Sequence, residues 1–224
     1  MKSPFKKMPI FPEVNDKDLR TLTKLINNPI TGAFYRKRFE MVFDVCKLPV
    51  KSILEIGYGS GFMAYALAPF TQNYIGIDLH SSNKEVMNCF QKMGITNVNF
   101  FQEDAQNMKN IETNSIDLIV SVSCLEHIKN QDAVQKEVFR VLNPGGMAIY
   151  GMPLKNILTS SFFSIVGYDH ALIHPSTIND TKKAAEMAGL LLKEEYFFPG
   201  LYKNLGIYWT GKLMKGVYNA NSNE

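Results

Sequence analysis

The protein has 224 residues, and its composition is 46% hydrophobic and 20% charged, with 15 Gly and 10 Pro. This is typical of a globular domain with a full hydrophobic core, and it excludes a collagen, a coiled coil and a largely disordered chain. The 24 basic and 21 acidic residues give a net charge of only +3, which argues against a protein that mainly binds a nucleic-acid backbone.

The cysteines and the apolar segments predict a cytoplasmic protein. Cys46, Cys89 and Cys124 are far apart and form no C-x-x-C pair, as expected of buried thiols in a reducing compartment. No apolar run approaches the roughly 18 residues that span a bilayer, and prolines interrupt the basic N-terminal segment. The four histidines lack H-E-x-x-H spacing, so no metal site is expected.

Apolar periodicity predicts helices and strands that alternate along the chain. Residues 1–14 form a proline-punctuated arm, and two helices follow within 15–46, divided at Asn28-Pro29 and Gly32. The next predicted elements are, in chain order, a strand over 52–56, a helix over 62–68, a strand over 74–78, a helix over 82–94 and strands over 98–101 and 116–122. They are followed by a helix over 132–142, a strand over 147–152, a helix over 176–189 and a strand over 190–198.

Local signals mark several boundaries of these elements. Ser82 and Glu85 have the spacing of a capping box, Pro144-Gly145-Gly146 stops a helix, and Ser176 is a candidate N-cap. Such alternation predicts an α/β fold, a doubly wound and mostly parallel sheet with right-handed crossovers and helices on both faces.

The expected organisation has three parts. An N-terminal arm with cap helices occupies 1–46, and the main domain occupies 47–200 with a loop or lid insertion over 154–175. A tail follows over 201–224. Its apolar residues recur every four positions, as in a helix, yet 207–210 also has the composition of an edge strand. Both alternatives stay open for the tail.

The segment that carries chemical information is Ile53-Leu-Glu-Ile-Gly-Tyr-Gly-Ser-Gly61, in which a strand runs into glycines at alternate positions. Glycine is required where φ is positive and where the backbone must approach a ligand closely. Asp78 ends the next predicted strand, where its carboxylate can accept both hydroxyls of a ribose. The spacing is G-x-G-x-G, with Phe62 where the dinucleotide fingerprint has its third glycine, so NAD and FAD are disfavoured.

This segment resembles motif I of the class I S-adenosylmethionine-dependent methyltransferases. Four further segments resemble later motifs of that family in the same order, and the whole similarity covers about residues 35 to 198. The matching segments are 76–79, 101–105, 116–128, which contains Leu-Glu-His, and 140–146. The resemblance, closest to the broad small-molecule subgroup, implies a Rossmann-like sheet of about seven strands. It also implies S-adenosylmethionine as the methyl donor and S-adenosylhomocysteine as the product.

Cofactor-binding residues follow from the same resemblance. The methionine half of the cofactor would be lined by Glu55, Gly57, Tyr58, Gly59 and Gly61. For Glu55, satisfying backbone groups beneath the loop is the alternative role.

The resemblance also assigns residues to the nucleoside half. Asp78 would hold the ribose hydroxyls and Leu79 would pack on adenine. The adenine amino group would be bound by Asp104, with Ala105 beside it, while Ser121 would present its backbone near the methionine ammonium.

The acceptor side is less defined by the sequence. The candidate general bases are His127, His170 and His174, with Glu126 behind them. An ordering role is the alternative for His127. No Asp/Asn-Pro-Pro-Tyr/Phe follows the fourth strand, so DNA bases are disfavoured and a small-molecule acceptor is expected, with O-, N- and C-methylation left open. The aromatic, mildly basic tail leaves open contact with a lipid-linked acceptor or a partner subunit, and the chain is expected to be a monomer or a homodimer.

Two other functions compete with an active methyltransferase. One is a non-catalytic scaffold that binds S-adenosylmethionine or S-adenosylhomocysteine, and the other is a nicotinamide-dependent oxidoreductase on a similar sheet. The glycine spacing disfavours the second, whereas a plugged acceptor cleft would favour the first.

Overall fold

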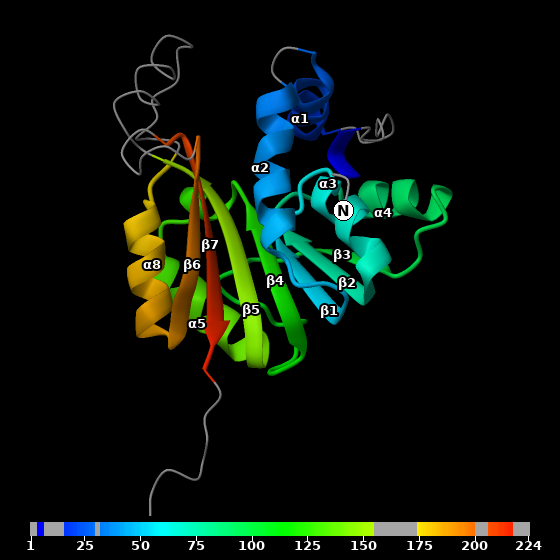
Figure 1. The fold of residues 1–224 in the computed structure, drawn as a ribbon. Helices are drawn as coiled ribbons and strands as arrows, with labels where there is room; N and C mark the ends of the chain where they lie inside the picture. The colour runs from blue at the N-terminus through cyan, green and yellow to red at the C-terminus, as the bar shows by residue number, and fades with distance from the viewer. Residues whose placement is uncertain (1–3, 7–15, 30–31, 155–173, 200–205, 217–224) are drawn as a thin grey trace, which may run out of the picture.

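The structure is a computed structural model that describes residues 4–6, 16–29, 32–154, 174–199 and 206–216 (Figure 1). Most of the expected lid, residues 155–173, lies outside the described residues, as do 201–205 and 217–224 of the tail. Among the described residues, no helix is long and apolar enough to cross a membrane.

A sheet of seven strands runs through the described part of the chain, in the order β3-β2-β1-β4-β5-β7-β6. Its strands are β1 (Val50–Ile56), β2 (Thr71–Asp78), β3 (Val98–Gln102), β4 (Ile116–Val122), β5 (Leu142–Pro153), β6 (Leu190–Phe198) and β7 (Tyr208–Lys215). The first five strands pair in parallel, and β7 pairs antiparallel with both β5 and β6. The predicted mostly parallel, Rossmann-like α/β fold is confirmed.

Helices cover both faces of this sheet (Figure 1). They are α1 (Lys17–Asn27), α2 (Gly32–Val45), α3 (Phe62–Leu67), α4 (Asn83–Lys92), α5 (Gln131–Val141) and α8 (Ile178–Met187). One hydrophobic core joins α1 to α4 with one face of the sheet, and a second core joins α5 and α8 with the other face. Strand β1 serves both, because its successive side chains alternate: Ile53 enters the first core and Leu54 the second.

The N-terminal helices are held by aromatic packing. Phe39 and Phe43 of α2 are buried. Phe5 stacks on Phe39, with ring centroids 5.7 Å apart, and meets Phe43 edge-to-face at 5.9 Å. Such contacts contribute beyond the area that they bury. They keep α2 standing over the ends of the central strands (Figure 1).

The tail contains a strand rather than a helix, and that strand is not at the edge. Tyr208–Lys215 pairs on both sides, which leaves β6 as the edge strand. A four-residue spacing brings Trp209 and Leu213 to one face of a strand as well as of a helix, so the sequence pattern did not separate the two structures.

Of two predicted boundary signals, the helix end before Pro144 is confirmed within one residue, and the capping box at Ser82 is wrong. β5 begins directly after α5, at Leu142, and Pro144-Gly145-Gly146 forms an irregularity within the strand, where the register with β4 shifts between Ile116 and Leu118. Ser82 precedes α4 as expected, but its side chain makes no cap hydrogen bond, and its backbone N–H donates to His80 Nδ1 at 3.2 Å.

Helix α8 begins with a complete capping box one residue later than predicted. Thr177 Oγ1 accepts the backbone N–H of Asp180, and the Asp180 carboxylate accepts the backbone N–H of Thr177. Ser176 instead donates its hydroxyl to the carbonyl of Ile128 at 2.6 Å, which fastens the start of this helix to the loop after β4.

Replacing the cap residue should destabilise the protein measurably. We expect Thr177→Ala to lower the free energy of unfolding by about 1 kcal/mol, because one backbone donor of α8 loses its partner. Urea denaturation measures the change, and Thr177→Ser, which keeps the hydroxyl, is the control. Equal stability of Thr177→Ala and the unchanged protein would contradict a stabilising cap.

Candidate functional site

The glycine-rich loop after β1 has the backbone that its sequence requires. Gly57, Gly59 and Gly61 have φ of 78°, 51° and 82°, in the region that favours glycine. A Cβ on Gly57 would collide with the sulfur of Cys124, so the missing side chain lets the loop after β4 touch the loop after β1. The exits of these two neighbouring strands therefore form one surface.

Asp78 at the end of β2 fixes this loop from the other side. Its Oδ2 accepts the backbone N–H of Gly59 at 3.0 Å, and its Oδ1 accepts that of Leu79 at 2.7 Å. His80 adds a second link, because its Nε2 lies 3.1 Å from the carbonyl oxygen of Gly59. Since His80 Nδ1 accepts the N–H of Ser82, Nε2 is the donor to Gly59. The carboxylate of Asp78 keeps unused acceptor capacity at the strand end.

Two apolar side chains flank Asp78 at the same edge. Leu79 is 67% exposed and Phe101, at the end of β3, is 37% exposed. Gln102 donates its side-chain amide to the carbonyl of Leu79, so these strand ends are adjacent. Exposed apolar groups beside a hydrogen-bonding carboxylate suit a flat heterocycle attached to a ribose.

The loop after β3 contributes the other two predicted nucleoside residues. Ala105 is buried, and the carboxylate of Asp104 is half-buried. Asp104 Oδ1 accepts the backbone N–H of Gln106 at 2.8 Å, which fixes the direction of its side chain. The predicted role of Asp104 stays a prediction.

Tyr58 belongs to the core rather than to the open side of the loop. Its ring is 3% exposed and packs on Phe100 and His80, with centroids 4.6 and 4.8 Å away. Its hydroxyl is buried without a hydrogen-bond partner among the described residues. Burial, together with nearby Asp78 and Glu55, raises the pKa of this phenol. Only the backbone of Tyr58 is left to face a ligand at the loop.

Glu55 lies beneath the loop in a fully enclosed position. It is 1% exposed, and Tyr74 donates its hydroxyl to Oε2 at 2.6 Å. Burial raises the pKa of Glu55 to about 8; the hydrogen bonds from Tyr74 and from the backbone of Ala64 oppose this rise, and Asp78 adds to it. Through these bonds the carboxyl joins β1, β2 and α3 under the site.

Ser121 secures the junction between β1 and β4. Its hydroxyl donates to the carbonyl of Ile56 at 3.0 Å, and its side chain is 1% exposed. Only the backbone of Ser121 can serve the role expected of it near the methionine ammonium, and that role stays a prediction.

Side chains from distant segments gather at Ser123, the first residue after β4. Arg38 of α2 donates from Nη1 to Ser123 Oγ at 3.2 Å, and the hydroxyl of Tyr208 in β7 lies 3.0 Å from the same oxygen. The guanidinium also stacks over Tyr35, 4.2 Å from the ring centroid. Ser123 has a φ of 53°, so the chain turns sharply here. Arg38 and Tyr208 thus form a wall beside the exit of β4.

The two described histidines among the predicted catalytic residues lie together. His127 is in a short 3₁₀ helix, η3 (Leu125–His127), and its ring centroid is 4.9 Å from that of His174. Glu126 joins them, and one potential ligand atom from each of the three residues lies within 4.8 Å of the others. His170 lies outside the described residues.

Glu126 has the second enclosed carboxyl of the site. Burial raises its pKa to about 8, while a bond to its own backbone and the charge of Arg38 lower it. Its Oε2 has no hydrogen-bond partner among the described residues. The sequence patterns did not indicate Ser123 or Tyr208 as site residues, and they indicated Glu126 only as a residue behind the candidate bases. The contact between Ser123 and Tyr208 joins positions 85 residues apart, beyond the reach of local patterns.

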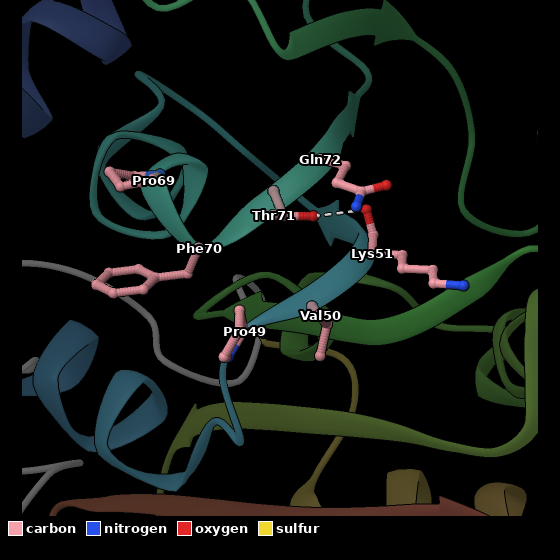
Figure 2. Close-up of a pocket in the computed structure, with 7 residues that line it drawn as sticks. All are labelled: Pro49, Val50, Lys51, Pro69, Phe70, Thr71 and Gln72. Atoms are coloured by element: carbon pink, nitrogen blue, oxygen red, sulfur yellow. Dashed lines mark hydrogen bonds between the residues drawn. The ribbon is translucent and has the colours of Figure 1, made fainter.

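A surface groove of about 350 Å³ lies at the opposite end of the parallel strands, where β1 and β2 begin. Figure 2 shows it at the beginnings of β1 and β2, where the hydroxyl of Thr71 donates to the carbonyl of Lys51. Ligands of open α/β sheets bind at the carboxyl ends of the strands. This groove is therefore separate from the site described above.

Comparisons with known proteins agree with this geometry. Residues 54–150 match the family described as a methyltransferase domain. A ubiquinone biosynthesis O-methyltransferase of Pseudomonas fluorescens (strain Pf0-1) is 25% identical over 167 residues, which cover 70% of this chain and 72% of the relative.

Solved structures share the fold at lower identity. A phosphoethanolamine N-methyltransferase 2 of Haemonchus contortus, in complex with S-adenosyl-L-methionine, gives a TM-score of 0.68 at 19% identity and covers 94% of this chain and 61% of its own. The [4+2]-cyclase SpnF also gives 0.68, at 16% identity, over 85% of this chain and 84% of its own.

The donor set at this edge of the sheet fits S-adenosylmethionine. Asp78 offers a carboxylate for ribose hydroxyls, and the apolar surfaces of Leu79 and Phe101 stand beside it. The domain match, the curated relatives and the solved structures all indicate a class I S-adenosylmethionine-dependent methyltransferase. Its activity is the transfer of a methyl group from S-adenosylmethionine to a small-molecule acceptor.

Burial of Glu55 should make stability depend on pH. Its pKa in the folded protein, about 8, lies above its ordinary value of about 4.3, so the folded state favours the protonated carboxyl. The stability that it contributes is complete below the ordinary pKa and is lost as the pH rises through the folded pKa. Because Glu55→Gln cannot titrate, we expect the variant to gain stability relative to the unchanged protein as the pH rises from about 5 to about 8.

Urea denaturation across that pH range measures the difference for Glu55. Glu186→Gln, an exposed change on α8, is the matched control and should leave the pH profile unchanged. A stability difference for Glu55→Gln that stays constant with pH would contradict the raised pKa.

Proposed function

We propose that this methyltransferase methylates a hydroxyl oxygen of its small-molecule acceptor and that the acceptor binds at the exit of β4. The observation that carries this proposal is the cluster of Glu126, His127 and His174 beside that exit. A hydroxyl loses its proton when it is methylated. Groups that accept this proton, or that stabilise the negative charge left on the oxygen, accelerate the step. The Pseudomonas fluorescens relative, an O-methyltransferase of ubiquinone biosynthesis, supports the same choice.

The loop after β4, which contains Glu126 and His127, touches the glycine-rich loop. Cys124 packs against Gly57, and Glu126 and His127 follow within the same short loop. The backbone N–H of Ser176 donates to the carbonyl of Glu126 at 3.2 Å. Because His174 is two residues before Ser176, this bond holds it near the loop. The acceptor hydroxyl in this proposal lies between the cofactor loop and the cluster.

The cofactor residues predicted from the sequence take their roles in this proposal. Bound S-adenosylmethionine supplies a methyl group that its sulfonium has already activated. Asp78 binds the ribose hydroxyls, Leu79 packs on adenine and Asp104 binds the adenine amino group with Ala105 beside it. These residues orient the donor, and well-oriented reactants gain on the order of 7–11 kcal/mol over free ones.

The wall beside β4 shapes the acceptor half. Arg38 and Tyr208 meet at Ser123, and Tyr35 lies under the guanidinium. An aromatic and cationic wall suits an acceptor with a flat or partly anionic body. A cytoplasmic location completes the proposal and is supported by the three free cysteines.

Loss of the carboxylate at the end of β2 should weaken cofactor binding. We expect Asp78→Asn to weaken S-adenosylhomocysteine about 10- to 100-fold, because hydrogen bonds to a charged group contribute about 1.5–3 kcal/mol. Isothermal titration calorimetry measures the affinity, and circular dichroism verifies the fold. Asp132→Asn on α5, an exposed change, is the control. Unchanged affinity in Asp78→Asn would contradict the proposal that Asp78 binds the ribose hydroxyls.

The choice of methylated atom is tested with a panel of acceptors. Initial rates with phenols, alcohols and amines should show transfer to hydroxyl oxygen. His174→Ala should lower kcat with the accepted hydroxyl compound by about 10²- to 10⁴-fold and leave the KM for S-adenosylmethionine nearly unchanged. Lys129→Ala, an exposed change next to the cluster, is the control. Transfer to amines alone would overturn the proposal.

A further inference from the structure

Three side chains of metal-ligand type converge beside β4. Glu126 and His127 come from η3, and His174 comes from the segment before α8. One ligand atom from each lies within 4.8 Å of the other two. The backbone of this region is fixed, because Ser176 donates its N–H to the carbonyl of Glu126 and its hydroxyl to the carbonyl of Ile128.

A separate observation concerns the carboxyl group of Glu126. Glu126 is 2% exposed, and its Oε2 has no hydrogen-bond partner in the described part of the chain. A buried carboxylate oxygen without a partner is costly, since it has lost its water and gained nothing in exchange. Arg38 is the cation near it, but the bond that Arg38 makes from Nη1 goes to Ser123. A cation bound by the cluster would satisfy Oε2.

We propose that Glu126, His127 and His174 bind a divalent transition-metal ion of the zinc, iron(II) or manganese class. Two imidazoles and one carboxylate form a borderline donor set, which suits these ions better than calcium or magnesium. Three protein ligands leave coordination positions open, as in catalytic rather than structural zinc sites. This proposal departs from the sequence-based expectation of no metal, because His174 lies far along the chain from the Glu-His pair.

The geometry requires only a small adjustment. Ligand atoms around a tetrahedral ion with bonds of about 2.1 Å lie about 3.4 Å apart. The present separations of up to 4.8 Å close to that value through side-chain torsions. His127 is exposed and His174 is half-buried, whereas Glu126 is 2% exposed, so the two imidazoles lie on the solvent side of the carboxyl.

The inference rests on the proposed function for its chemical role. An acceptor hydroxyl that coordinates the ion loses its proton to water more readily than a free one. The oxygen then forms its bond to the methyl carbon while the bond between that carbon and the donor sulfur breaks. The products are a methyl ether, neutral S-adenosylhomocysteine and the released proton, so atoms and charges balance.

Metal binding is tested without reference to activity. Tag-free protein is treated with a chelator, dialysed and titrated with zinc chloride in a calorimeter. We expect one ion per chain and at least a roughly 10-fold loss of affinity in both Glu126→Gln and His174→Ala. Glu186→Gln on α8 is the matched control and should bind zinc as the unchanged protein does. Affinity for S-adenosylhomocysteine verifies that each variant is folded.

Cobalt(II) substitution reports the ligand types. Nitrogen and oxygen ligation gives weak visible bands, whereas an intense near-ultraviolet band would reveal thiolate ligation by the free cysteines and overturn the assignment. The assignment also fails if no zinc binds or if both variants bind it unchanged. Hydroxyl methylation that persists in metal-free protein would sink this inference and leave the proposed function standing. Specific zinc binding without hydroxyl methylation would contradict the proposed function and leave the metal site standing.

Discussion

The carboxyl ends of β1, β2 and β4 lie side by side because β1 pairs in parallel with both of its neighbours. Glu55 is opposite Gly76 in β2 and Val120 in β4. Parallel strands deliver their exits to the same side. The loop after β1 is then held from two directions, by Cys124 packed against Gly57 and by the bond from Gly59 to Asp78. These contacts are formed within the protein itself, so the loop is arranged for a ligand before one binds. Every other part of the site is positioned relative to this loop.

Two buried carboxyl groups near the carboxyl ends of the strands differ in their hydrogen-bond partners. Burial raises the pKa of both Glu55 and Glu126 to about 8. Glu55 has the hydroxyl of Tyr74 and the backbone of Ala64 as partners, which makes it a tie between elements. Glu126 keeps one oxygen without a hydrogen bond in the described part of the chain. For Glu55, hydrogen bonds within the fold offset the cost of desolvation. For Glu126, a ligand would have to offset it.

Local patterns predicted the elements that depend on local physics. Strands 116–122 and 190–198 and the glycine loop were found because alternation, continuous apolar runs and positive φ leave marks in neighbouring residues. The tail was ambiguous because a spacing of four fits a helix and a strand equally. The acceptor wall was missed for another reason: Arg38 and Tyr208 meet at Ser123 only after α2 and β7 have been placed. Such contacts depend on topology, which single-sequence patterns do not carry.

The cofactor half and the acceptor half of the site have different structural origins. The cofactor half comes from consecutive strand ends of the central sheet, and the acceptor half comes from α2, β7 and the segment at His174, which are fastened to it. An N-methyltransferase and a [4+2]-cyclase reach the same TM-score of 0.68 against this chain, so the shared sheet does not select the chemistry. In this protein the loop after β4 provides Glu126 and His127, and the fastened segment before α8 brings His174 beside them. The identity of the reaction therefore depends on those side chains, which the sheet supports without specifying.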